Sequence, residues 1–273
     1  TIDGNSVVLD STFGTKIASN LNLAADSLVL GSGQISVVLD GATGVSLDTT
    51  VDPHLVLSGS TLRNALGTSD LTLRSYRSID FHGSGTFGSE TLENLTLSSG
   101  GIRGFGQNGG TVRIEADQLT LENPVNAASM PSPAVMDGSL VIDAENVLLG
   151  SNAFRVGGYR NVSVTAGKGF SFSGTGAFST SGNLTLRTSR ISGESGADYS
   201  ITSDGGLALE RLEGDTQEEA SLGANLTLQG ASVLANTDIR LPSGNLTIRA
   251  TSGDLTIGGN LYAGGASKTF NTQ

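Results

Sequence analysis

The chain has 273 residues and a formal net charge of −11, with 39 glycines, no cysteine and 15% charged side chains. The lack of cysteine excludes disulfides and thiolate metal sites, and the acidic balance disfavours nucleic acid and anionic membranes as partners, because both require a clustered basic face. Hydrophobic residues reach 37% but aromatic residues only 5%, which predicts a folded core filled mainly by aliphatic side chains.

No apolar run approaches the roughly 18 residues that span a bilayer, so we expect no membrane insertion. Thr1 opens directly on repeat-like sequence without a signal peptide. We therefore expect the chain to be part of a longer protein whose targeting segment lies elsewhere.

Triplets whose first and third residues are apolar, most with a polar residue between them, recur along the chain, as at Leu21, Leu28, Val45 and Leu55. In a β-strand the two outer side chains of such a triplet share one face, and the middle one points to the other. Gly or Ser interrupts every stretch of a dozen residues that has the apolar spacing of a helix. The sequence therefore predicts an all-β fold of short strands.

A more specific triplet, Leu-Thr-Leu or Leu-Thr-Ile, adds a longer period. It starts at Leu71, Leu95, Leu119, Leu184, Leu226, Leu246 and Leu255. The first five steps between these starts fit one, one, three, two and one periods of about 20–24 residues. Three strands with their turns fill one period, which predicts a right-handed, single-stranded parallel β-helix with three strands per coil. Residues 1–273 would form a single segment of about 12 coils, roughly 58 Å long.

Longer gaps between triplets predict loops that leave the coils. They fall at residues 98–110, 123–138, 150–160, 188–198 and 210–224. Insertions disturb the stacking least at the corners of a coil, so we expect these loops there, and any specific recognition is expected on them first.

Two motifs have simple interpretations in terms of strands and turns. The Gly-x-Gly-x-x-Gly matches at Gly83, Gly85 and Gly88 and at Gly104, Gly106 and Gly109 lack the following helix that a dinucleotide site needs, so they predict turn glycines. Sequons at Asn94, Asn161, Asn183, Asn225 and Asn245 each stand directly before the first apolar residue of a triplet. The repeat itself generates them, and glycosylation is the alternative, which depends on the host.

Two Asp-x-His pairs, Asp52/His54 and Asp80/His82, are separated by close to one enlarged coil. Stacked, they would form a metal or acid–base site. Solvated residues at coil corners are the alternative, because Pro53 disfavours a regular central strand.

Acidic residues also form groupings that an outer-face glycan-cleaving site would require. They are Asp48 with Asp52, Glu115 with Asp117, and Glu210, Glu213, Asp215, Glu218 and Glu219. The last grouping fits a solvated excursion or a weak calcium site better than catalysis. The sequence predicts no catalytic residue, no cofactor and no metal site.

Arginine and aromatic residues gather at two places. The groups are Arg74, Tyr76 and Arg77, and Arg155, Tyr159 and Arg160 next to Phe154. Such groups stack on sugars and pair with acidic glycans, so these residues are candidate ligand contacts, with exposed scatter as the alternative.

The sequence Asp-Ile-Arg-Leu-Pro-Ser-Gly-Asn-Leu-Thr-Ile at 238–248, followed by Ser-Gly-Asp-Leu-Thr-Ile at 252–257, resembles the filamentous haemagglutinin type of bacterial exoprotein. Gly-Asn-Leu-Thr-Leu at 182–186 has a similar sequence pattern. The resemblance implies a large adhesin that is exported by two-partner secretion and built as a right-handed parallel β-helix. The Asn-Pro-Asn-Leu and Asn-Pro-Asn-Gly motifs typical of that family's secretion domain are absent, so the resemblance implies the shaft or a later segment.

We therefore expect a non-enzymatic rod segment of a secreted, cell-surface bacterial adhesin, which mediates or presents adhesion to host cells, other bacteria or biofilm matrix. The expected partners are a glycan or a surface receptor, the outer-membrane transporter of the full-length protein, and neighbouring coils of the same longer chain. A β-helical polysaccharide lyase or glycoside hydrolase is one alternative, and a spacer without a ligand is another.

Overall fold

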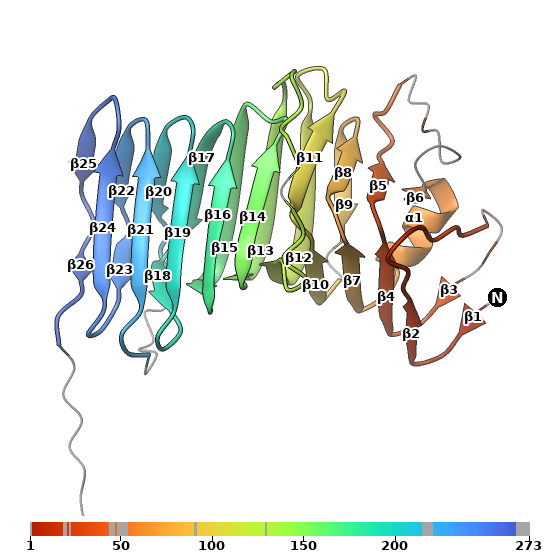
Figure 1. The fold of residues 1–273 in the computed structure, drawn as a ribbon, viewed down its shortest axis with the longest axis horizontal. Coiled ribbons are helices and arrows are strands. Elements are labelled where there is room, and N and C mark those ends of the chain that lie inside the picture. Colours follow the sequence, from red (N-terminus) through yellow and green to blue (C-terminus); the bar gives the residue numbers. More distant parts are fainter. Residues whose placement is uncertain are drawn as a thin grey trace, which may run out of the picture.

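A computed structural model describes residues 2–18, 21, 23–43, 47, 54–89, 92–128, 130–214 and 221–265. Strands make up 56% of the described residues and stack as a parallel β-solenoid of about 10 turns (Figure 1). The parallel β-helix predicted from the triplets is therefore confirmed.

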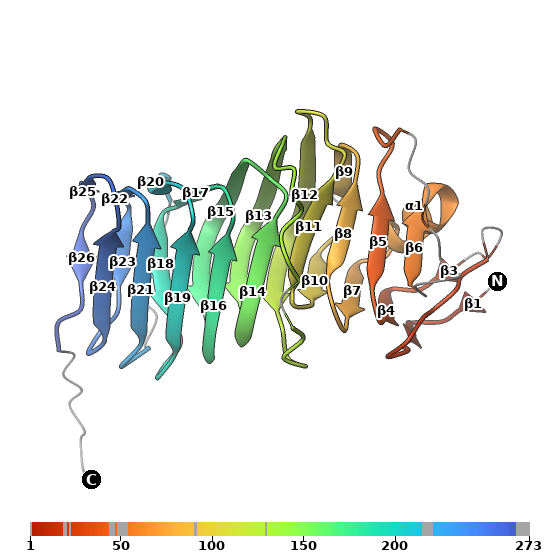
Figure 2. The same cartoon turned by 45° about the horizontal axis from the view of Figure 1, so that its top comes forward.

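Three faces run along the solenoid, and the chain passes from one to the next within each coil. The first face holds β2 (Ser6–Leu9), β4 (Ser27–Ser32), β7 (Asp70–Ser75), β10 (Asn94–Ser98), β18 (Arg190–Gly193), β23 (Asp238–Arg240) and β26 (Leu261–Tyr262). The second face holds β6 (Leu55–Ser58), β5 (Ile35–Val38), β8 (Ile79–His82), β11 (Gly101–Phe105), β14 (Asn152–Gly157), β16 (Thr175–Thr180), β19 (Asp198–Ser203), β21 (Asn225–Gly230) and β24 (Asn245–Ala250) (Figure 2). The third face holds β9 (Gly85–Gly88), β17 (Asn183–Thr188), β20 (Leu207–Arg211), β22 (Val233–Asn236) and β25 (Leu255–Ile257).

Three long strands, β12 (Thr111–Glu122), β13 (Ser139–Leu149) and β15 (Asn161–Phe172), each cover two faces. Their first halves pair within the third face and their second halves within the first face. In β12, two consecutive exposed residues, Asp117 and Gln118, interrupt the inward alternation between Ala116 and Leu119. The strand turns the corner of the coil at this interruption.

Inward positions repeat from coil to coil. Leu71, Leu95 and Leu119 pair in register on the first face, and each is at most 2% exposed. The steps from Leu71 to Leu95 and from Leu95 to Leu119 therefore each correspond to a single coil, as predicted. Such columns bury one aliphatic side chain about every 4.8 Å, and each buried leucine contributes about 1.5–3 kcal/mol to folding.

The longer gaps between Leu-Thr-Leu triplets do not count whole coils, so that part of the prediction was wrong. Leu184 and Leu255 lie on the third face, whereas Leu226 lies on the second. The triplet suits any face, because each one needs an inward–outward–inward strand.

The solenoid has about 10 turns and not the predicted number of about 12. The difference arises because the described residues of 123–138, residues 212–214 and helix α1 (Gly59–Leu66) lie outside the stacked strands.

Three of the five predicted loops hold regular strands, so those predictions were wrong. β11 lies within 98–110, β14 within 150–160 and β18 within 188–198. In β11 a glycine, Gly104, takes one of the two inward positions, which hides the alternation. The described residues of 123–138 and 212–224 contain no strand, so these two segments do leave the coils.

Glycines inside the solenoid make room for two tyrosine rings. A Cβ atom on Gly104 would lie 2.5 Å from the Tyr159 ring, and one on Gly176 would lie 2.5 Å from the Tyr199 ring. Both tyrosines are at most 2% exposed. The Tyr199 hydroxyl donates to the Gly150 carbonyl at 3.0 Å, whereas the Tyr159 hydroxyl has no hydrogen-bond partner in the part of the chain that the structure describes.

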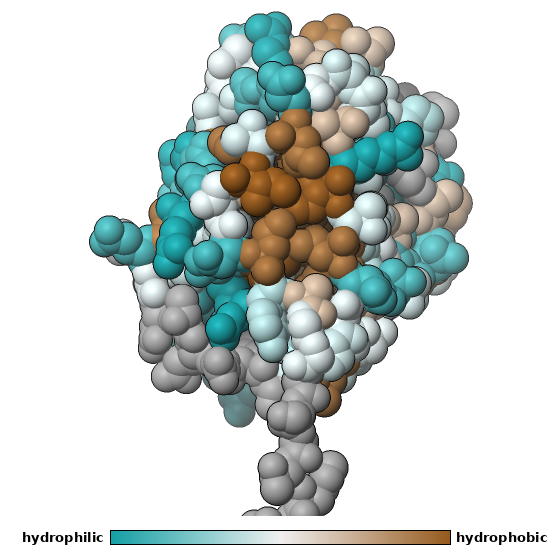
Figure 3. All heavy atoms as spheres, turned by 90° about the vertical axis from the view of Figure 1, so that its left-hand side faces the viewer, coloured by the Kyte–Doolittle hydropathy of each residue, from teal (hydrophilic) through white to brown (hydrophobic). Residues whose placement is uncertain are grey.

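The two ends of the solenoid differ. At the amino-terminal end, α1 packs on β6 and on β3 (Leu23–Ala24), which pairs with β1 (Ile2–Asp3), and it buries Leu62 and Ala65. At the carboxyl-terminal end, an apolar centre with a polar rim is open to solvent (Figure 3). Ile257 and Tyr262 there are 50% and 44% exposed.

Candidate functional site

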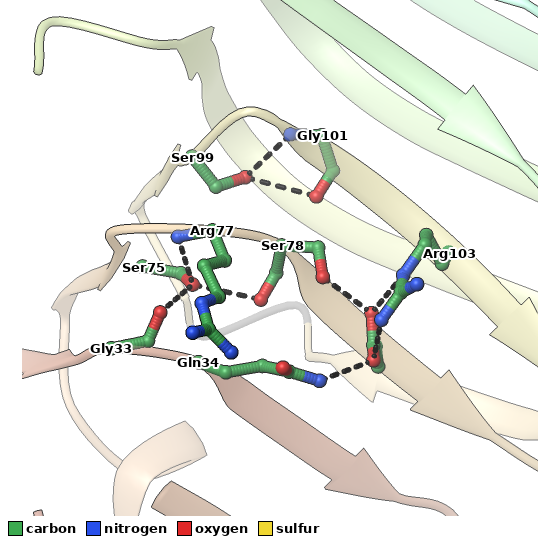
Figure 4. A network of polar contacts seen from close by, with 9 residues as sticks. Gly33, Gln34, Ser75, Arg77, Ser78, Ser99, Gly101 and Arg103 are labelled. Atoms are coloured by element: carbon green, nitrogen blue, oxygen red, sulfur yellow. Dashed lines mark hydrogen bonds and ion pairs between the residues drawn. The ribbon is translucent and has the colours of Figure 1, made fainter. Parts of the chain in front are cut away.

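The first predicted arginine–aromatic group gathers around one carboxylate. Arg74 Nη1 lies 3.3 Å from Asp10 Oδ2, and the Tyr76 hydroxyl donates to the same oxygen at 3.2 Å. Burial and the Asp10 carboxylate raise the pKa of Tyr76. The Arg77 backbone N–H donates to Ser75 Oγ at 3.2 Å, at the corner after β7 (Figure 4). Arg74 and Tyr76 are therefore engaged in a contact between coils.

The second group is split by the fold. Arg155 lies on the outer side of β14 and reaches Asp204 at 3.0 Å and Ser181 at 3.1 Å. Arg160 is exposed. Tyr159 is 1% exposed, and burial raises its pKa. The prediction that Tyr159 contacts a ligand was therefore wrong, because Gly104 leaves space for its ring inside the solenoid.

Asp80 holds a polar network together on the second face, and Figure 4 labels its partners Gln34, Ser78 and Arg103. Asp80 points outward from β8, yet it is only 3% exposed. Arg103 of the next coil donates to both carboxylate oxygens, at 2.9 and 2.7 Å. Gln34 donates at 2.6 Å and Ser78 at 2.8 Å. Since these donors come from three neighbouring strand segments, the carboxylate works as a clamp between coils.

His82 lies beside this clamp. Its ring stacks on Phe105 with centroids 5.2 Å apart, and the Arg103 guanidinium lies 5.1 Å from the same phenyl ring. Burial lowers the pKa of His82, with smaller contributions from His54 and Arg103, while Asp80 opposes the shift. The lowered pKa favours the neutral form of the imidazole.

The two Asp-x-His motifs do not form a metal site within the described residues. His54 directly precedes β6, so it lies on the second face with Asp80 and His82, and it is 7% exposed. Asp52 lies outside the described residues. The interpretation of solvated corner residues was wrong for His54 and Asp80, which are both buried. No described group of three or more His, Asp or Glu residues is arranged to hold an ion.

Among the described members of the predicted acidic groupings, Glu210 forms an ion pair with the neighbouring coil. Arg187 donates to Glu210 at 2.7 Å, and Arg113 pairs with Asp143 across β12 and β13. Glu115 lies 3.8 Å from the same Arg113. Asp48, Asp215, Glu218 and Glu219 lie outside the described residues.

The sequon asparagines begin strands and form ladders. Asn183 donates to Asn161 at 3.1 Å, Asn245 donates to Asn225 at 2.7 Å, and Asn94 donates to Asp70. Each of these asparagines opens a strand, as the position of the sequons before the triplets predicts, and side-chain amides stack between coils.

Five of the six glycines in the two Gly-x-Gly-x-x-Gly matches adopt the positive φ values that glycine favours, namely Gly83, Gly85, Gly88, Gly106 and Gly109. Gly83, Gly106 and Gly109 lie between strands, as predicted. The prediction of turn glycines was wrong for Gly85 and Gly88, which begin and end β9, and for Gly104, a strand residue that faces the Tyr159 ring.

A groove of about 830 Å³ on the first face was missed by the sequence analysis. Its outer lining comes from β12, β13, β15, β18 and the segment that contains Gly214. The principal side chains are those of Gln118, Thr120, Asn146, Leu148, Lys168, Ser171, Arg190 and Ser192. We call this the first-face groove.

Register explains why the first-face groove exists. Gln118, Asn146 and Gly169 pair along one outward column, and Arg190, directly before Ile191, continues it. Thr120, Leu148, Ser171 and Ser192 form the adjacent outward column. Small residues in successive coils, namely Gly169, Ser171 and Ser192, leave a depression beside the larger Asn146 and Leu148. Ser192 is only 6% exposed, so it lies at the floor.

Comparison with known proteins gives no further information, because no family model, curated protein or solved structure matches the chain. Among the described residues, no helix has the length and apolar character required to cross a membrane.

Proposed function

We propose that the chain is a rod segment of a bacterial cell-surface adhesin and that it has no enzymatic activity. The observation that supports this most is the continuous stack of about 10 parallel turns, in which side chains from successive coils form long outer columns. Such a stack is stiff along its axis, because each coil is bonded to both neighbours.

Inter-coil contacts on the outer faces support the mechanical role. Ion pairs such as Arg187 with Glu210 and Lys168 with Glu145 join successive coils, as do the asparagine ladders. Each exposed pair adds only up to about 1 kcal/mol, but pairs recur along the rod. The outer surface then presents weak binding sites, and many rods on one cell convert them into firm attachment.

Adhesion of coated particles tests the proposal. Beads that carry the chain at increasing density are passed over epithelial cells and over bacterial biofilm in a flow chamber, with beads that carry albumin as the control. We expect retention that rises more steeply than in proportion to density, since attachment is multivalent. Retention equal to the albumin control at every density and on both surfaces would refute the proposal.

Glycan cleavage is the alternative function, and the first-face groove is the place where it would occur. Glu145, the carboxylate beside this groove, accepts a hydrogen bond from Lys168 at 2.5 Å. Incubation with neutral and uronic-acid polysaccharides, followed by chromatography of the products, separates the two functions. Shortened chains that disappear in the variant Glu145→Gln would favour the enzyme.

A further inference from the structure

We propose that the first-face groove binds an oligosaccharide that carries one carboxylate beside neutral sugars, and that Arg190 holds this carboxylate. This inference rests on the proposed function, because it names the ligand class for a binding surface of the rod.

Among the described residues, Arg190 is the cation of the first-face groove that has no ionic partner. Its Nη1 atom is buried and has no hydrogen-bond partner, and the side chain forms no ion pair with the described part of the chain. Asp238, its register neighbour on β23, pairs instead with Arg211 at 3.3 Å. A buried cationic donor without an acceptor carries a desolvation penalty that an anionic oxygen relieves. The planar guanidinium fork matches a carboxylate.

The charge pattern around Arg190 favours a ligand with a single negative charge. Lys168, the other cation of the lining, already contacts Glu145 at 2.5 Å. Among the described lining residues, one positive charge therefore remains for the ligand. The net charge of −11 on the whole chain repels densely sulfated or phosphorylated polymers, which carry many charges close together.

The remaining lining favours sugars as the neutral part of the ligand. Gln118 and Asn146 present amides, and Thr120 and Ser171 present hydroxyls, on two columns that advance by about 4.8 Å per coil. Phe170, the aromatic residue among the described lining, belongs to the inward column and is 2% exposed. The outer lining thus supplies hydrogen bonds along an extended line, which suits a hydroxyl-rich chain lying parallel to the axis.

Titration with matched trisaccharides tests the assignment. Sialyllactose carries one carboxylate beside two neutral sugars, and its sialic acid carboxamide is the neutral analogue of nearly the same shape. Binding of each to the whole chain is followed by backbone amide shifts in NMR spectra. We expect shifts around the first-face groove with sialyllactose, and at least about tenfold weaker binding of the carboxamide, because the charge-assisted bond to Arg190 is lost.

Two variants with matched controls locate the site. Arg190→Gln should weaken sialyllactose binding at least about tenfold, whereas Arg249→Gln removes the same charge from the exposed outer side of β24 and should leave binding unchanged. Ser171→Tyr should block the groove by bulk alone, whereas Thr227→Tyr adds the same ring on the second face and should not. Circular dichroism and thermal unfolding confirm that each variant is folded.

Several outcomes would overturn the inference. They are equal binding of the acid and the carboxamide, unchanged binding by folded Arg190→Gln, tighter binding of a heparin tetrasaccharide, and equal binding of a short peptide with one glutamate. If the beads adhere while sialyllactose does not bind, the adhesin proposal stands and this inference fails. If sialyllactose binds at Arg190 while the beads do not adhere, the assignment of the groove stands and the adhesin proposal fails.

Discussion

Tyr159 and Tyr199 form a matched pair that tests the energetics of the solenoid interior. Both rings are buried against glycines, but only the Tyr199 hydroxyl has a hydrogen-bond acceptor within the described residues, the Gly150 carbonyl at 3.0 Å. The Tyr159 hydroxyl is buried without a partner there. The substitution Tyr→Phe removes the same atom at each position, so it should have opposite effects on the free energy of unfolding.

The magnitudes follow from general hydrogen-bond energetics. Tyr199→Phe breaks a buried hydrogen bond and leaves the Gly150 carbonyl with one acceptor site empty, so the free energy of unfolding should fall by about 1 kcal/mol. Tyr159→Phe removes an unsatisfied donor, so the free energy of unfolding should rise by about 1 kcal/mol. For a chain of this size the melting temperatures of the two variants should then differ by about 4–8 °C.

Thermal and urea unfolding, followed by circular dichroism at neutral pH, measure the difference. Tyr262→Phe is the control, because Tyr262 is 44% exposed and should change stability by less than about 0.5 kcal/mol. A loss of stability in Tyr159→Phe equal to that in Tyr199→Phe would refute the reasoning, since it would mean that the Tyr159 hydroxyl has a partner.

The remaining predictions concern alkaline pH, the second-face clamp and the aliphatic columns. Burial raises the pKa of Tyr159 and of Tyr199, so these tyrosines should leave the free energy of unfolding unchanged below about pH 10. Above about pH 10 the free energy of unfolding should fall by up to about 1.4 kcal/mol per pH unit for each tyrosine. In Tyr159→Phe this fall with pH, measured by urea unfolding, should be less steep. Asp80→Asn breaks the buried pair with Arg103 and should lower the free energy of unfolding by about 3 kcal/mol. Asp204→Asn breaks an exposed pair and should lower it by less than about 1 kcal/mol. Equal losses of stability in urea unfolding would contradict the role of Asp80 in joining the coils. Leu209→Ala in a fully buried position should cost about 2–5 kcal/mol, whereas Ile257→Ala, half-exposed at the open end, should cost clearly less, as differential scanning calorimetry can measure.

The strands and their parallel stacking were predictable because inward positions obey a local rule. Leu71, Leu95 and Leu119 each need an aliphatic side chain at the same place in the coil, so spacing in the sequence carries the signal. The face on which a triplet lies was not predictable, as Leu184 and Leu226 show. All three faces impose the same alternation, and an excursion such as 123–138 shifts the count without leaving a mark in the triplets.

Some residues escaped prediction because their environment depends on other coils. Asp80 is buried on an outer face because Gln34 and Arg103, 46 residues before it and 23 after it, close over its carboxylate. Tyr159 is inside because Gly104, on the neighbouring strand β11 of the second face, leaves space. The local pattern of polarity predicts that Asp80 and Tyr159 are both exposed. Their burial follows only from the register between coils.

The same dependence on register determines where a binding surface arises on such a rod. Inward residues are mostly aliphatic or aromatic side chains that fill the interior. Outward residues contact their counterparts in the next coil and are otherwise free to vary. Asn146 and Arg190 are far apart in the sequence, yet they belong to one outward column with Gly169 between them. Gly169 at the middle position turns a flat column into a groove. It also leaves Arg190 without a neighbouring side chain in the column on the side of Gly169. The groove and its charge thus result from one residue choice per coil, which leaves the packing of the core unchanged.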